Sequence, residues 1–297
     1  MELRVLRYFL TVAREGGLTG AGEVLHVTQP TMSRQIRELE EELGQKLFIR
    51  TTRSMVLTPE GMLLRKRAEE ILEMAERTKA EFSAMGEAVA GDVRIGSGET
   101  FALKRVTDLM ARMREDHPGI RFQIYSGNAE DVTERLDKGL LDFGVLVEPV
   151  DVSRYSSLRL PAEDTWGLIL RRDHPLARKA SIRREDLAGL PLIMSRQAMA
   201  PPKSRSDYLD WFGKSYETLN IAAGYNLMYN GAMMVKSGLG CAVGLDGIVN
   251  TTETSDLCFR PFDPPLKAGV AVIWKKYQVF SGPAGMLLEK MTEAFGE

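Results

Sequence analysis

The chain has 297 residues, of which 44% are hydrophobic, so it is long enough for about two domains with buried cores. Its formal net charge of −2 excludes a strongly basic protein, but residues 1–67 carry 11 Lys+Arg and 8 Asp+Glu, leaving an acidic remainder. Two cysteines, Cys241 and Cys258, are too few for a disulfide framework or a zinc site. We see no export signal and no apolar run of about 20 residues, and we therefore expect a cytoplasmic protein without a membrane segment.

Two helices are predicted at the start of the chain. Residues 4–14 place apolar side chains at helical spacing, and Gly16-Gly17 ends that helix. Thr19 is the predicted N-cap of a second, short helix. Its inner face consists of Ala21, Val24 and Leu25.

A third helix follows after a tight turn, and its two faces differ chemically. It begins after Thr28, a predicted N-cap, and ends at Gly44, which favours a helix-turn-helix. The apolar face consists of Met32, Ile36, Leu39 and Leu43. The opposite face of the first turns consists of Gln29, Pro30, Ser33, Arg34 and Arg37. Arg, Gln and Ser are side chains that contact bases and phosphates in the major groove, although an ordinary solvated face has a similar composition.

Two short apolar runs at 47–49 and 55–57 flank a basic, hydroxyl-rich segment that contains Arg50 and Arg53. This arrangement predicts a β-hairpin whose tip carries positive charge. Placed directly after the helix-turn-helix, such a hairpin is the wing of a winged helix-turn-helix. The predicted minor-groove or backbone contact is Arg53.

Thr58-Pro59-Glu60 is a helix-start signature, with an N-cap, a proline in the first turn and an acid near the positive helix end. We predict a helix from residue 59 to about 90, which would be about 48 Å long. Small and apolar residues recur along it at alternating spacings of four and three, as in a coiled coil. We expect this seam to pack on a second copy of the chain, with packing on its own domain as the alternative. The seam consists of Leu64, Ala68, Ile71, Ala75, Thr78, Phe82, Met85 and Val89.

Ala90-Gly91-Asp92 marks a domain boundary, beyond which strands alternate with helices. The β-α-β-α-β order over residues 93–147 predicts a mostly parallel, doubly wound sheet. A second α/β unit begins near residue 162, and a late strand and a final helix complete the chain. The predicted strands lie at 93–95, 120–124, 143–147, 166–170, 192–194, 241–243 and 269–274.

The run from Ala21 to Ile36, AGEVLHVTQPTMSRQI, closely resembles the LysR-type transcriptional regulators. The likeness continues through Leu39-Glu40, Leu43-Gly44, 47–50 and 57–61. It is looser but consistent at 139–142, 173–177 and 235–240, so it covers essentially the whole chain.

The resemblance implies a sequence-specific DNA-binding transcriptional regulator of the α/β class. Its expected parts are a winged helix-turn-helix (1–58), a linker dimerisation helix (59–90) and a periplasmic-binding-protein-like effector domain (91–297). That domain would have two lobes, lobe I at 91–161 and 269–297 and lobe II at 162–268. A small-molecule effector would bind between the lobes and modulate DNA binding. Proteins of this family often assemble as dimers of dimers, so we expect a homodimer that pairs into a tetramer on double-stranded DNA.

The two expected sites are specified by residue. The predicted DNA contacts are Gln29, Pro30, Thr31, Ser33, Arg34, Arg37, Arg50 and Arg53. Ligands of open α/β lobes collect at the carboxyl ends of strands, where helix N-termini point. The predicted effector-binding residues are therefore Thr100, Phe101, Ser126, Asn128, Ser195 and Arg196. They suit a small carboxylate or other anion, but Glu99 and Asp246 lie close by in the pattern and leave a zwitterionic or cationic ligand open.

Two other functions share parts of this pattern. An enzyme is disfavoured because the chain has only three histidines and lacks a nucleophile elbow, a zincin motif and a P-loop. Gly96-Ser97-Gly98 is similar to a dinucleotide-binding turn, but Phe101 stands where the third glycine belongs. A solute-binding protein would share the C-terminal fold and have no use for the exposed face around Arg34. We expect no cofactor and no metal.

Overall fold

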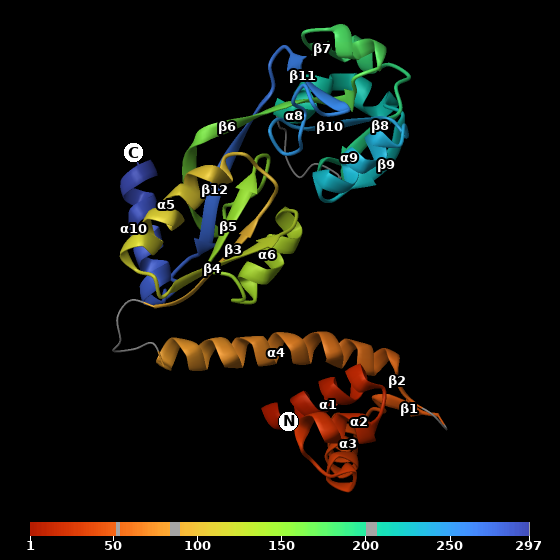
Figure 1. Cartoon of the computed structure of the whole chain (residues 1–297), viewed down its shortest axis with the longest axis vertical. Coiled ribbons are helices and arrows are strands. Elements are labelled where there is room, and N and C mark those ends of the chain that lie inside the picture. Colours follow the sequence, from red (N-terminus) through yellow and green to blue (C-terminus); the bar gives the residue numbers. More distant parts are fainter. Residues whose placement is uncertain (52–53, 84–89, 200–206, 297) are drawn as a thin grey trace. The chain divides into compact units, whose positions relative to one another are not determined.

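The computed structural model describes residues 1–51, 54–83, 90–199 and 207–296 (Figure 1). The chain divides into two compact units, residues 1–86 and residues 87–297. Each unit has hydrophobic cores of its own.

The N-terminal unit begins with three helices, α1 (Leu3–Glu15), α2 (Leu18–Leu25) and α3 (Gln29–Leu43). They enclose a core in which Phe9, Met32 and Ile36 are fully buried. The predicted helices are confirmed, but Thr19 is not an N-cap. Gly16 ends α1 in a left-handed conformation and the extended Gly17 already precedes α2, so Thr19 lies inside the first turn.

A two-stranded antiparallel hairpin follows, formed by β1 (Phe48–Arg50) and β2 (Met55–Leu57). Phe48 packs on Phe9 with ring centroids 5.3 Å apart, which fixes the hairpin to the helical core. The backbone N–H of Met55 also donates to the carbonyl of Gly16 at 2.8 Å. The predicted wing is therefore present and its two strands are anchored to the helices, while Thr52 and Arg53 lie outside the described residues.

The long helix α4 (Pro59–Ser83) starts where the sequence predicts, because the Thr58 hydroxyl caps the backbone N–H of Gly61 at 2.9 Å. The predicted seam divides in two. Leu64 and Ala68 pack on the core of their own unit, as the alternative interpretation expected, whereas Ile71 and Phe82 are exposed. Met85 and Val89 lie outside the described residues, and Ala90, the expected end of the helix, is not helical.

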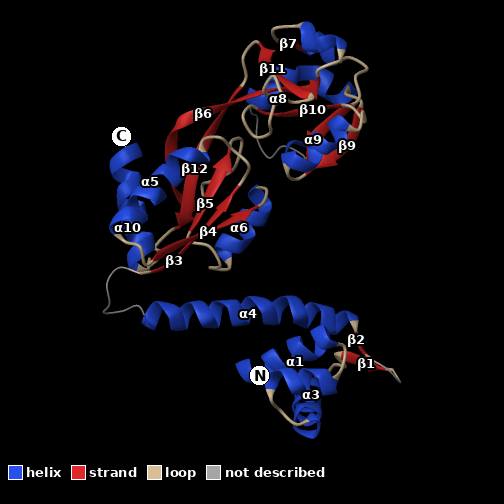
Figure 2. Ribbon diagram, in the orientation of Figure 1, coloured by secondary structure: helices blue, strands red, loops and turns tan. Residues whose placement is uncertain are grey.

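The first lobe of the C-terminal unit contains β3 (Gly91–Ser97), β4 (Ile120–Ser126) and β5 (Phe143–Val147), paired in parallel. Helices α5 (Leu103–Asp116) and α10 (Gly282–Phe295) cover one face of this sheet, and α6 (Ala129–Asp137) covers the other (Figure 2). The β-α-β-α-β prediction is confirmed here. It places the carboxyl ends of β3 and β4 next to each other, since Ser97 pairs with Ser126.

One strand, β6 (Tyr155–Arg171), passes through both lobes. Its first part pairs with β12 (Lys267–Lys275) up to Thr165, and its second part pairs with β10 (Cys241–Leu245) from Trp166 onward. The change of lobe therefore falls between Thr165 and Trp166, inside a continuous strand, close to the predicted start of the second unit near residue 162.

The second lobe is a mixed sheet with strand order β6-β10-β8-β9, and β11 pairs with β6 and β7. Its core holds an aromatic cluster around Trp166, Tyr208, Trp211 and Phe212. The remaining elements are η1 (Pro175–Arg178), β7 (Ile182–Arg183), η2 (Arg184–Leu187), β8 (Leu192–Ser195), α7 (Arg196–Met199), α8 (Asp207–Phe212), η3 (Gly213–Thr218), β9 (Ile221–Tyr225), α9 (Met228–Lys236) and β11 (Leu257–Asp263).

Candidate functional site

The amino-terminal half of α3 presents a polar surface opposite its buried stripe. Met32, Ile36 and Leu39 are buried in the core, which turns the other side of the helix to solvent. Leu43, predicted to complete the stripe, is 40% exposed because it stands in the last turn beside Gly44. The predicted contact residues of α3 that are exposed are Gln29, Pro30, Thr31, Arg34 and Arg37, and Ser33 is half-buried among them.

Arg34 is a highly exposed cation of this surface. Its side chain is 79% exposed, and its Nε donates to Oε1 of Glu38 at 2.7 Å. Gln35 holds the same carboxylate from the other side, with Nε2 2.6 Å from Oε2. The hydrogen bond and the charge of Glu38 raise the pKa of the Arg34 guanidinium. The pair orients Arg34 along the helix and leaves its outer N–H groups facing solvent.

Arg50 ends β1 and is exposed where the strand meets the turn of the wing, opposite Met55. The predicted minor-groove residue Arg53 lies outside the described residues. Arg37 of α3 and Arg50 of β1 both line one hollow of the N-terminal unit.

In the C-terminal unit, Thr100 lies at the start of α5 and is buried against β6. Its hydroxyl donates to Oδ2 of Asp164 at 2.5 Å and accepts the backbone N–H of Ala102 at 3.1 Å. Asp164 is only 5% exposed. Burial raises the pKa of this carboxyl, and the nearby charge of Asp246 raises it further. Hydrogen bonds from Thr100 and from the amides of Ala102 and Phe101 offset only part of that effect.

The neighbouring Glu99 joins the two lobes. Its carboxylate accepts the backbone N–H of Met228, the first residue of the nine-residue helix α9. Phe101 is exposed but lies against Gly247 of the second lobe, where an added Cβ would be 3.1 Å from the ring. The first lobe thus reaches the second through two residues that flank Thr100.

The start of α6 is also occupied from within the chain. Asn128 and Asp131 form a reciprocal capping box, with the Asp131 N–H 2.9 Å from Oδ1 of Asn128. The N–H of Ala129 donates across the lobes to Oε1 of Gln197 at 3.3 Å. Two of the helix N-termini that the sequence offers to an anion, at α5 and α6, are therefore filled by acceptors of this chain, as is the start of α9, which was not predicted.

The other predicted effector residues are spread along the strand ends. Ser126 is exposed at the end of β4, Ser195 is half-buried at the end of β8, and Arg196 is exposed after it. Within the described part of the chain, Arg196 makes no ion pair. The sequence interpretation missed Asp164, Met228 and Gln197. Asp164 gave no local signal, since it lies in the polar run just before the predicted strand at 166–170.

Within the described ranges, no group of three or more His, Cys, Asp and Glu residues is placed to hold a metal ion. None of the helices described is long and apolar enough to span a membrane.

Comparison with known proteins identifies both units. Residues 3–62 match the family model for the bacterial regulatory helix-turn-helix protein of the lysR family, and residues 86–295 match the LysR substrate binding domain. The chain belongs to the LysR family. It is a transcriptional regulator with a helix-turn-helix DNA-binding domain and an effector-binding domain.

Relatives of the LysR family align with the chain over most of its length. An uncharacterized HTH-type transcriptional regulator YvbU of Bacillus subtilis (strain 168) is 26% identical over 100% of this chain and 99% of the relative. The HTH-type transcriptional regulator IlvY of Escherichia coli (strain K12) is 27% identical over 82% of this chain and 81% of the relative. The fold is that of full-length CbnR, crystallised with its target DNA, with a TM-score of 0.75, 20% identity and 100% coverage of both chains.

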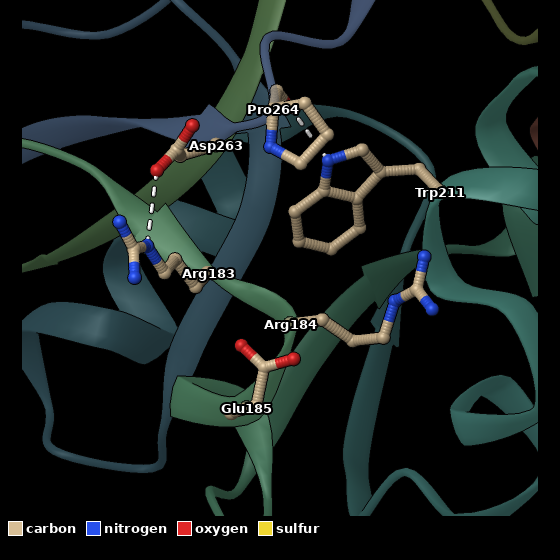
Figure 3. Close-up of a pocket in the computed structure, with 6 residues that line it drawn as sticks. All are labelled: Arg183, Arg184, Glu185, Trp211, Asp263 and Pro264. Atoms are coloured by element: carbon tan, nitrogen blue, oxygen red, sulfur yellow. Dashed lines mark hydrogen bonds and ion pairs between the residues drawn. The ribbon is translucent and has the colours of Figure 1, made fainter.

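One further hollow of this LysR-family chain lies apart from the predicted effector residues, between β7, β11 and α8 (Figure 3). Its volume is about 300 Å³. Arg183 pairs with Asp263 at 3.1 Å, and the Trp211 indole donates to the carbonyl of Pro264 at 2.7 Å. Arg184 donates to the carbonyl of Asp210 at 3.3 Å. Most of these polar groups are paired within the second lobe, although the buried Nε of Arg184 has no hydrogen-bond partner among the described residues, and we assign no ligand to this hollow.

Proposed function

We propose that this regulator reads its operator with the first turns of α3. The observation that carries the proposal is the sharp division of α3. One side is buried to 2% exposure or less at Met32, Ile36 and Leu39, and the other side presents Arg34 to solvent. Arg34 would contact base edges, with Gln29 and Ser33 beside it. Arg37 and Arg50 would contact phosphates, and Arg53 of the wing would reach the backbone or the minor groove.

Self-association through α4 is the second part of the proposal. The exposed apolar residues Leu63, Ile71 and Phe82 leave this helix with a surface that its own unit does not cover. Pairing two copies along that surface would bury it and place two α3 helices on successive half-sites. A homodimer, and a tetramer formed from two dimers, is the assembly we propose.

The effector would bind where the lobes meet, around Glu99, Thr100 and Phe101. Glu99, Asp164 and Asp246 gather there, and within the described residues none of them forms an ion pair with a basic side chain. A simple carboxylate would meet repulsion at this junction. The charge therefore favours an effector that brings a cationic or hydrogen-bond-donating group, with Arg196 at the second lobe available to a carboxylate of a zwitterion.

Binding of such a ligand would favour one arrangement of the lobes over another and so shift the geometry of the oligomer on DNA. We propose no catalytic role for the chain. Two of its three histidines occupy helix ends, His26 after α2 and His117 after α5, and His174 caps η1 with Nδ1 3.2 Å from the N–H of Leu176.

A gel-shift experiment with the full-length protein and genomic fragments from its source organism tests the function. The expected result is retention of a small set of fragments in the presence of excess random DNA. A protein that retards no fragment, or all fragments equally, would contradict sequence-specific reading.

A further inference from the structure

The hollow between the carboxyl half of α3 and the wing is lined mostly by basic side chains. It measures about 310 Å³ and is lined by Arg37, Glu40, Lys46, Phe48 and Arg50. The cations come from separate segments: Arg37 from α3, Lys46 from the turn after it and Arg50 from β1. Three cations against one carboxylate leave the lining with a net positive charge.

Glu40 forms the floor of this hollow and is 7% exposed. Its Oε1 accepts the backbone N–H of Leu47 at 3.0 Å and that of Phe48 at 3.4 Å. The wing strand therefore starts from a fixed point on α3. Burial raises the pKa of the Glu40 carboxyl, but the hydrogen bonds from Lys46 and from the amide of Leu47 outweigh it, and the net shift is downward.

Lys46 is held by the same carboxylate, with Nζ 2.7 Å from Oε2 of Glu40. Its side chain is nevertheless 74% exposed, so the ammonium keeps donors that face solvent. Arg37 and Arg50 make no ion pair in the part of the chain that the structure describes. The hollow thus presents the Lys46 ammonium, which Glu40 positions, and the guanidinium groups of Arg37 and Arg50, which have no carboxylate partner among the described residues.

Arg37 belongs both to the polar face of α3 and to the hollow, which places the two surfaces side by side. Any duplex that α3 reads would bring its backbone past the hollow. We propose that the hollow is a seat for one backbone phosphate of double-stranded DNA, with Lys46 as its third cation and Glu40 as the residue that positions Lys46. This inference rests on the proposed reading of DNA by α3.

The seat carries no base information, and its contribution is therefore measurable on DNA of any sequence. Each neutralised phosphate contributes about 0.9 to the slope of log K against log salt concentration. With one contact fewer, the factor by which affinity falls between 50 and 200 mM salt is about three times smaller.

The experiment is a salt titration of full-length wild type, Lys46→Ala and Lys104→Ala on a random-sequence duplex. Lys104 is the matched control because it is also an exposed lysine in an ion pair, with Asp108 at 2.7 Å, and it lies in the other unit. Lys46→Ala is expected to bind more weakly at low salt and to reduce the slope by about 0.9, whereas Lys104→Ala matches wild type. An unchanged slope for Lys46→Ala overturns the phosphate seat. A wild type that binds no duplex overturns DNA reading itself.

The role of Glu40 is tested by Glu40→Gln, which keeps an acceptor for the amides of Leu47 and Phe48 and removes the charge that holds Lys46. The change in affinity caused by Glu40→Gln is expected to vanish in a Lys46→Ala background. Thermal unfolding of each variant shows separately whether the substitution destabilises the unit that contains the wing. The same change of affinity in both backgrounds, or no change in either, overturns the positioning of Lys46 by Glu40.

Discussion

The carboxylate of Glu99 accepts the backbone N–H of Met228, the first residue of α9. The bond links the two lobes of the effector domain, because Glu99 precedes α5 in the first lobe and α9 belongs to the second. Beside it, Asp164 holds Thr100 at the start of α5. The chain thus supplies its own carboxylates to helix ends at which an anionic ligand would otherwise bind.

Replacing Glu99 with Gln is expected to weaken the link between the lobes. A charged acceptor at a helix N-terminus contributes about 0.3–1 kcal/mol, and the neutral amide retains only part of this. Urea unfolding should show a loss of that order. Calorimetry with an identified effector then tests the ligand class. A cationic or zwitterionic effector should bind more weakly to Glu99→Gln, and tighter binding would mean that the effector is an anion that competes with Glu99.

The buried carboxyl of Asp164 predicts a pH dependence. Its pKa is raised in the folded chain, so the folded state binds more protons than the unfolded state above the ordinary Asp pKa. The stability that the protonated form contributes is therefore lost as pH rises from about 4 through the raised pKa. We expect the free energy of unfolding of wild type, measured relative to Asp164→Asn, to fall over this range. A difference that stays constant between pH 4.5 and 7.5 would contradict the assigned shift.

The α4 surface predicts a dissociable dimer. Glu in place of both Ile71 and Phe82 would bury charges at the interface and should release monomers. The two sites are exposed in the single chain, so the fold should be retained. Size-exclusion chromatography with light scattering measures the mass. Ala68→Glu is the contrasting variant, since Ala68 is fully buried and its replacement should destabilise the N-terminal unit itself. If the double variant remains a dimer, the main interface does not lie on α4.

The elements of the N-terminal unit were predictable because their signals are local. Gly16 and Gly44 end α1 and α3 in left-handed conformations, and Thr58 caps α4 through its own hydroxyl. The packing of α4 was not predictable in the same way. A heptad pattern does not reveal which partner covers it, and Ala68 is covered by its own unit.

In the effector domain, several features depend on pairing between residues far apart in the chain, and local sequence patterns do not predict them. The strand β6 alternates between buried and exposed residues in its first half and is continuously buried from Trp166 to Leu170. The two halves differ in pattern because each pairs within a different lobe. The sequence therefore predicts only the continuously apolar part, 166–170, as a strand. The edge strand β9 exposes most of its residues and was missed for lack of an apolar run. Asp164 was missed because its partner, Thr100, is 64 residues away in the chain.

The most direct test of the central claim compares wild type and Arg34→Ala on the operator and on random DNA. The operator is first selected by wild type from a library of random duplexes, and both affinities are then measured at one salt concentration. If Arg34 reads a base pair, Arg34→Ala should lose about 1–3 kcal/mol on the operator and much less on random DNA, so the specificity ratio falls. Equal losses on both DNAs, or no loss on either, would contradict base reading by α3.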